Sequence, residues 1–257
     1  MSRNYSTEAI VLGSHKFGEA DRVVTLFTAA RGKVPTVVKG VRKVKSKFGG
    51  RLEPFTHLQV QLHEGRNLHT LTGADTVRTH ASLRDGPSSL QAGLAFIDML
   101  GSITTDFERR PRSFNLLVRY LDEMDAAGRN FPGSRYDQEE YALEMAFAQK
   151  SLVLGAELKL LLLAGFLPHL ANCAVCGIEG AHSRFSAQAG GAICENCGGE
   201  SFRISAGALE IMRNLLEKPL AKAPGLKIDA STGNEIWKAI REICRYHIGI
   251  NLKVKPW

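Results

Sequence analysis

His57-Leu-Gln-Val-Gln-Leu-His63 is the stretch that decides the fold of the N-terminal part of the chain. Its apolar residues Leu58, Val60 and Leu62 alternate with polar residues, and a period of two places them on one face of a β-strand. Shorter runs of β-branched residues, separated by turn residues, predict four more strands at Glu8–Leu12, Arg22–Phe27, Val34–Val38 and near Leu68–Leu71. Five short strands within about eighty residues predict a small closed β-barrel of the OB type.

The rest of the chain has helical spacing. Apolar residues recur every three or four positions from about residue 88, and a long helix is expected from Gln138 to Ala164. Ser205 is placed to cap a helix that ends before Pro219, and Thr232-Gly-Asn-Glu235 has the spacing of a capping box at the start of the last helix. We therefore expect an α+β multi-domain protein. Its parts are an OB-fold barrel (1–80), an α-helical domain (81–170 and 201–257) and an inserted zinc finger (171–200).

Four cysteines form two CxxC pairs, Cys173-Ala-Val-Cys176 and Cys194-Glu-Asn-Cys197, with seventeen residues between them. Each pair puts two sulfurs on one side of a tight turn, where both can reach a metal at about 2.3 Å. Four thiolates complete a tetrahedral zinc ion and leave no position for water, so we predict a structural Zn²⁺ and no hydrolytic chemistry. His169 or His182 as a substitute ligand, or a redox pair, is the alternative. Cys244 stands apart and is expected in the core.

The segment from Arg22 to Leu52 contains no aspartate or glutamate, and its lysines and arginines are densest just before Gly49-Gly50. A cationic loop on a small barrel suits a phosphate backbone, because each lysine or arginine can displace a condensed counterion. Phe48 within this loop is expected to offer a ring for base stacking. No base-reading pattern is present, so binding without sequence specificity is expected. The predicted DNA-binding residues are Lys39, Arg42, Lys43, Lys45, Lys47 and Arg51.

Composition and motifs limit the possible functions further. The 257 residues carry a net charge of +7, which favours a polyanionic partner, whether nucleic acid or an acidic protein tail. The N-terminus lacks a secretory signal, so a cytoplasmic protein with reduced thiols is expected. No P-loop, nucleophile elbow or zinc-protease motif is present, so no catalytic residue is assigned and an enzyme is not expected. The alternative to DNA binding is a zinc-stabilised adaptor whose basic surface binds acidic tails.

Several of these segments, in their order along the chain, resemble the bacterial RecO family of recombination mediators. The barrel segments are Glu8–Leu12, Phe17–Arg22, Val38–Lys43 and Leu52–Phe55, and the later ones are Ala156–Leu160, Gly165–Pro168, the two CxxC pairs and Tyr246–Lys253.

The resemblance implies an OB fold, a helical domain and a four-cysteine zinc finger. It also implies binding of single- and double-stranded DNA, annealing of complementary strands and assistance to RecA on DNA coated by single-strand-binding protein. The partners it implies are RecR and the acidic C-terminal tail of single-strand-binding protein, with RecA indirectly and no membrane. The implied location is the cytoplasm, in association with the nucleoid.

Overall fold

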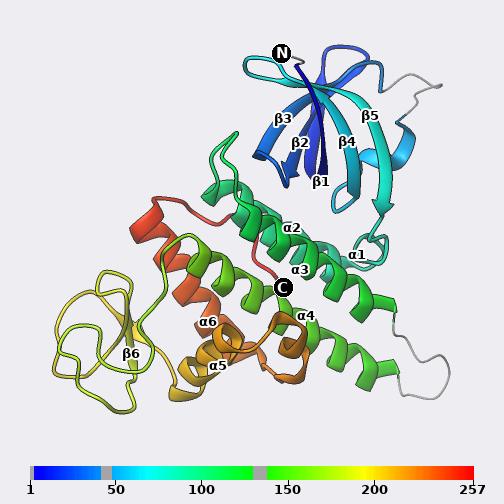
Figure 1. The fold of residues 1–257 in the computed structure, drawn as a ribbon. Coiled ribbons are helices and arrows are strands. Elements are labelled where there is room, and N and C mark those ends of the chain that lie inside the picture. Colours follow the sequence, from blue (N-terminus) through cyan, green and yellow to red (C-terminus); the bar gives the residue numbers. More distant parts are fainter. Residues whose placement is uncertain (1–2, 42–47, 130–137) are drawn as a thin grey trace. The chain divides into compact units, whose positions relative to one another are not determined.

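The strand predicted from the alternating stretch is present as β4 (His57–His63) of a closed five-stranded barrel (Figure 1). The other strands are β1 (Asn4–Phe17), β2 (Asp21–Thr28), β3 (Gly32–Val38) and β5 (His69–Arg78). Their order is β1-β2-β3-β5-β4, and only β3 and β5 pair in parallel. The prediction of an OB-type barrel is therefore confirmed, although β1 and β5 extend well beyond the runs that predicted them. β1 is long because it pairs with β4 through its first half and with β2 through its second.

The computed structural model describes residues 3–41, 48–129 and 138–257. The chain divides into two units. The barrel unit comprises Met1–Asp85 and Thr104–Asp125, and the helical unit comprises Gly86–Ile103 and Ala126–Trp257. The segment Thr104–Asp125 thus groups with the barrel although it follows a helix of the other unit.

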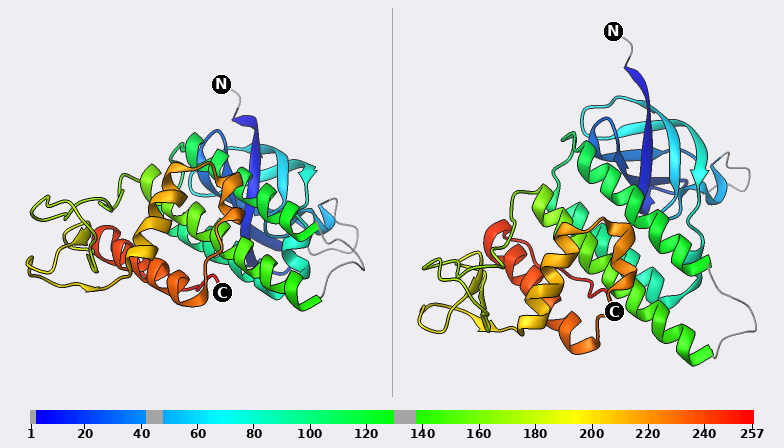
Figure 2. Two further views of the ribbon diagram at one scale, coloured as in Figure 1. Left: turned by 90° about the horizontal axis from the view of Figure 1, so that it is seen from below. Right: turned by 60° about the horizontal axis from the view of Figure 1, so that its bottom comes forward.

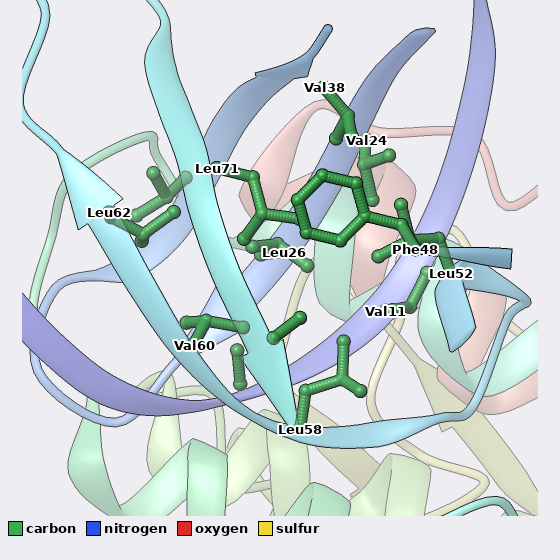
Figure 3. Close-up of a cluster of buried hydrophobic side chains, with 13 residues drawn as sticks. Val11, Val24, Leu26, Val38, Phe48, Leu52, Leu58, Val60, Leu62 and Leu71 are labelled. Atoms are coloured by element: carbon green, nitrogen blue, oxygen red, sulfur yellow. The ribbon is translucent and has the colours of Figure 1, made fainter. Parts of the chain in front are cut away.

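The barrel interior is filled by the inward-facing residues of all five strands and by Phe48 (Figure 3). Phe48 is only 3% exposed and lies among Val24, Leu71 and Leu52. The expectation that its ring stacks on bases is therefore wrong. The short 3-10 helix Gly49–Leu52 follows it, and the Arg51 N–H donates to the Phe48 carbonyl at 3.0 Å. The ring stays inside because burying a phenylalanine is worth about 1.5 to 3 kcal/mol.

Two helices complete the barrel unit, the single turn α1 (Ser82–Asp85) and α3 (Pro111–Arg129), which continues past the boundary of the unit. Phe114 on α3 lies between Phe27 of β2 and His57 of β4, with ring centroids 6.5 and 6.1 Å away. The carboxylate of Asp122 accepts from Arg78 at 2.6 Å and from the buried His80 at 3.0 Å. The packing of Phe114 and the hydrogen bonds of Asp122 therefore hold α3 against the barrel.

The helical unit is built around α4 (Gln138–Leu163), which packs against α2 (Pro87–Ile103), α5 (Ala206–Glu217) and α6 (Ala230–Ile243) (Figure 2). Every residue from Ser151 to Leu158 on α4 is buried, including Glu157. A helix that is buried on all sides needs apolar residues all round, which the sequence supplies here except at Glu157 and at Ser151, whose hydroxyl donates to the Phe147 carbonyl at 2.8 Å. Cys244, at the start of a π-helix (Cys244–Ile248), is also buried, as predicted.

Two predicted helix starts have different outcomes. Ser205 caps α5, and its Oγ accepts from the Ala208 N–H, as expected. The prediction that Thr232 begins the last helix is wrong, because Asp229 is the capping residue and accepts from the Thr232 N–H at 2.8 Å. Glu235 does not close a capping box either. Its carboxylate accepts from the N–H and Oγ of Ser205 and so ties α6 to the start of α5.

A three-stranded sheet, β6 (Arg184–Ser186), β7 (Gly191–Ile193) and β8 (Phe202–Arg203), lies at one end of the helical unit (Figure 2). β6 and β7 form a short antiparallel hairpin between the two CxxC pairs. Among the described residues, no helix is both long and apolar enough to span a bilayer.

Candidate metal centre and nucleic-acid interface

The four cysteines Cys173, Cys176, Cys194 and Cys197 meet at one point of the helical unit, with all four sulfurs within 4.8 Å of one another. The Sγ atoms of Cys173 and Cys197 are 3.8 Å apart, as are those of Cys176 and Cys194. Zinc bonded to four sulfurs at about 2.3 Å requires sulfurs about 3.8 Å apart at the corners of a tetrahedron. The spacing of the cysteines therefore fits this metal.

Neighbouring groups hold the two pairs in position. The Cys194 N–H donates to the Cys173 sulfur at 3.3 Å, and the Gly177 N–H donates to the Cys173 carbonyl at 2.8 Å in the turn of the first pair. Gly177 has a φ of +74°, a conformation that glycine adopts without strain. Arg184 on β6 donates to the Cys197 carbonyl at 3.1 Å and to Ser201. The second pair also has a backbone bond of its own, from the Cys197 N–H to the Cys194 carbonyl at 3.3 Å, so backbone bonds fix both pairs and Arg184 supports the second.

The pKa values of two of the thiols are shifted in opposite directions. Backbone amides, first that of Cys176, lower the pKa of Cys173 to about 5, whereas hydrogen bonds with the neighbouring thiols, first Cys194, raise the pKa of Cys197 to about 12. Four thiolates this close would repel one another, and a divalent cation would offset that repulsion. Full ionisation of the four cysteines is therefore expected only with a metal bound. His169 is exposed and is not among these ligand atoms, nor is the buried His182.

The outer face of β3 is the second candidate site. Along this strand Val34, Thr36 and Val38 point into the barrel, so the intervening residues, including Lys33, point outward. Lys39 follows the strand and is exposed. In OB folds the face formed by the second and third strands is the one that binds oligonucleotides.

Two of the six predicted DNA-binding residues lie in the described parts of the chain. Lys39 is followed by a turn in which the Gly40 N–H donates to the Asp21 carboxylate at 2.7 Å. Arg51 is exposed, and its guanidinium donates to the Ala74 carbonyl of β5 at 3.2 Å. Arg42, Lys43, Lys45 and Lys47 lie outside the described residues, so the loop stays a prediction.

A row of rings beside β3 was not predicted from the sequence. The Tyr5 hydroxyl and His69 Nδ1 are 2.9 Å apart, and Phe107 lies over His69 with ring centroids 5.0 Å apart. Burial lowers the pKa of His69 and raises that of Tyr5 to about 12. Both rings are therefore neutral at pH 7, and they share one hydrogen bond. No local pattern predicts this row, because Tyr5, His69 and Phe107 are far apart along the chain.

Comparison with known proteins assigns both parts of the chain. Residues 1–80 match the family described as Recombination protein O N terminal, and residues 141–256 match Recombination protein O C terminal. A DNA repair protein RecO of Rubrobacter xylanophilus is 33% identical over 250 residues, covering 95% of this chain and 90% of that relative. A RecO of Nocardioides sp. is 41% identical over 199 residues, and one of Thermobifida fusca is 39% identical over 197, each covering 75% of this chain.

The chain belongs to the RecO family. The resemblance stated from the sequence is confirmed over both units, including the barrel with the basic segment and the helical part with the cysteines. RecO proteins act in DNA repair and recombination, and this chain is a member by both its N-terminal and its C-terminal sequence.

Proposed function

We propose that this RecO protein is a recombination mediator that binds single- and double-stranded DNA without sequence specificity and anneals complementary strands. In this role it assists the loading of RecA onto DNA coated by single-strand-binding protein, with RecR and the acidic tail of single-strand-binding protein as partners. It works in the cytoplasm, in association with the nucleoid. No covalent step is involved, and the protein needs no catalytic residue for it.

Family membership is the observation that carries this proposal, and the barrel supplies its physical basis. The barrel of residues 1–80 is the DNA-binding domain, and its cations are Lys39, Arg42, Lys43, Lys45, Lys47 and Arg51. Each cation that meets a phosphate releases a counterion, which favours binding whatever the sequence. Neutralising two strands at once offsets their mutual repulsion and lets complementary bases pair.

The four cysteines hold a structural Zn²⁺ in this proposal. The sulfur spacing and the buried Cys173 support a closed site, since four protein ligands complete the coordination of zinc. Zinc then supplies folding energy to a short segment that has a three-stranded sheet but little core of its own.

Annealing of two complementary oligonucleotides, followed by fluorescence at low and moderate salt, tests the proposal. The protein is expected to accelerate annealing without nucleotide, and less so at higher salt. Replacement of Lys43, Lys45 and Lys47 together by alanine is expected to remove most of the acceleration.

Lys218, Lys222 and Lys227 supply the matched control, because all three are exposed and belong to the helical unit. Their replacement removes the same charge and is expected to leave annealing nearly unchanged. If the wild-type protein, folded and loaded with zinc, accelerates nothing at either salt, the adaptor with a basic surface for acidic tails becomes the better account.

A further inference from the structure

Phe107 stands at the exposed end of a row of four stacked side chains on the barrel unit. The Arg31 guanidinium lies 4.5 Å from the centre of the Tyr5 ring, and Tyr5 meets His69 edge to face at 5.7 Å. His69 in turn lies under Phe107 at 5.0 Å, with an angle of 30° between the rings. His69 is only 2% exposed, whereas Phe107 is 39% exposed. One side of the phenylalanine ring is therefore backed by the barrel, and the ring remains accessible from solvent.

The backbone holds this ring in an unfavourable conformation. Phe107 has a φ of +62°, a left-handed value that costs a residue other than glycine about 1 to 2 kcal/mol. Glycine or asparagine would occupy the position with less strain. Such strain persists only where the surroundings enforce it, and it is found often at ligand-binding positions. A large aromatic residue at this position is thus better explained by a use for its ring than by the turn itself.

The surroundings that enforce the conformation are contacts with the start of β3. The Phe107 N–H donates to the Lys33 carbonyl at 2.8 Å, and the Lys33 ammonium lies 3.4 Å from the Asp106 carboxylate. The Glu108 carbonyl would lie 1.9 Å from a Cβ atom at position 32, so only glycine permits this approach. These contacts fix the loop against the start of β3 and hold the Phe107 ring over His69, which pairs with the inward-facing Thr36, so the ring lies at this end of the barrel.

The charges around the ring suit a polyanion. The carboxylates that flank the ring are paired, Asp106 with Lys33 and Glu108 with Arg110 at 2.7 Å, and the exposed Arg109 forms no ion pair within the described part of the chain. A strand of nucleic acid that crosses the end of the barrel where β3 begins would therefore meet Arg109 and the exposed ring.

We propose that Phe107 stacks on one unpaired base of single-stranded DNA bound at the end of the barrel where β3 begins. The inference rests on the proposed function, to which it adds a contact with a base. Stacking of a base on an aromatic side chain tolerates every base, so it is compatible with binding without sequence specificity. The bases of a duplex are already stacked, so Phe107 should favour single strands over duplex DNA.

The test compares two single strands of equal length and charge, oligo(dT) and an oligonucleotide whose sugars carry no bases. Fluorescence anisotropy at fixed salt gives both affinities for the full-length protein. The wild type is expected to bind oligo(dT) about fivefold to a hundredfold more tightly, the range for one stacked base. Phe107→Gly removes the ring and suits the positive φ, so it is expected to abolish the preference while leaving the affinity for the abasic strand unchanged. Phe107→Trp is expected to keep it.

Tyr246→Ala is the matched control, because it removes a ring that is 47% exposed in the helical unit. It is expected to keep the preference. If Phe107→Gly binds both strands as the wild type does, or weakens both equally, the ring only seals the barrel and the inference is overturned. If the wild type binds neither strand, the proposed DNA binding fails as well, which separates the two failures.

Discussion

Glu157 is the residue whose surroundings are least expected from its chemistry. It lies on the fully buried stretch of α4, is 1% exposed, and its Oε2 atom has no hydrogen-bond partner among the described residues. Burial raises the pKa of Glu157 to about 8, so the side chain is mostly protonated at pH 7. In the unfolded chain the same group ionises near pH 4.5. The folded state therefore binds one more proton than the unfolded state between these two values.

This difference predicts a dependence of stability on pH. The free energy of unfolding should fall as the pH rises from about 4.5 to about 8 and level off above, because only the unfolded state gains from ionisation in that window. The loss attributable to Glu157 is at most about 3 kcal/mol by pH 7, at about 1.4 kcal/mol per pH unit. Glu157→Gln should remove that slope, as measured by urea denaturation at several pH values.

Glu144→Gln is the control for this measurement, since it makes the same change at an exposed position of the same helix. Its unfolding free energy should keep the pH slope of the wild type. A Glu157→Gln protein whose curve runs parallel to the wild-type curve would show that the buried carboxyl does not titrate as argued.

At the scale of elements, the start of α6 illustrates how a cap is chosen. Asp229 and Thr232 both carry side-chain oxygens that could cap the helix. Asp229 is the cap, because its carboxylate accepts from both the N–H and the hydroxyl of Thr232. These bonds lower the pKa of Asp229, the backbone one most. Asp229→Ala should lower the melting temperature by about 2 to 4 °C, whereas Ser231→Ala at the exposed neighbouring position should have little effect. Calorimetry at pH 7 measures both, and equal effects would argue against this cap.

The zinc segment is the second element with a sharp prediction. Cys194→Ser should abolish binding of about one zinc ion per chain, measured by atomic absorption, and should expose the amides of β6 and β7 to hydrogen exchange. The reason is that structural zinc contributes about 10 to 16 kcal/mol to the folding of such segments.

Cys244→Ala is the matched variant for the zinc segment, because the fifth cysteine is buried in the helical unit away from the cluster. It should retain zinc. Retention of the metal by Cys194→Ser would mean that another residue replaces the ligand.

At the scale of the whole molecule, the net charge of +7 favours DNA binding only where the fold brings several cations close together. If about six phosphates are engaged, the logarithm of the affinity for single strands should fall with the logarithm of salt concentration at a slope near −4, about −0.7 per contact. Titrations between low and moderate salt measure the slope. Replacement of Lys43, Lys45 and Lys47 should flatten it by about 2, and Phe107→Gly should leave it unchanged. An affinity independent of salt would contradict charge neutralisation.

Local patterns predicted much of this fold because each pattern has one physical solution. The alternation at His57–His63 can bury its apolar side only as a strand, and β4 has those bounds. Likewise, two CxxC pairs at this spacing bring four sulfurs together once a short hairpin joins them, and the hairpin is present. Errors arose where two residues could serve the same local purpose, as with Thr232 and Asp229, or where a residue's neighbours decide, as with Phe48.

The sequence by itself determined the barrel, the helical part, the cysteine cluster and the family, because these depend on periodicity and spacing along the chain. Only the tertiary structure decided that Phe48 is inside and Phe107 outside. Phe48 follows a lysine and Phe107 lies between two acidic residues, but neither local sequence predicts which ring is buried. The barrel closes over one ring, whereas the contact of Glu108 with Gly32 fixes the loop that presents the other. Burial depends on which segments distant in sequence come to lie side by side, and a pattern within one segment carries no information about that.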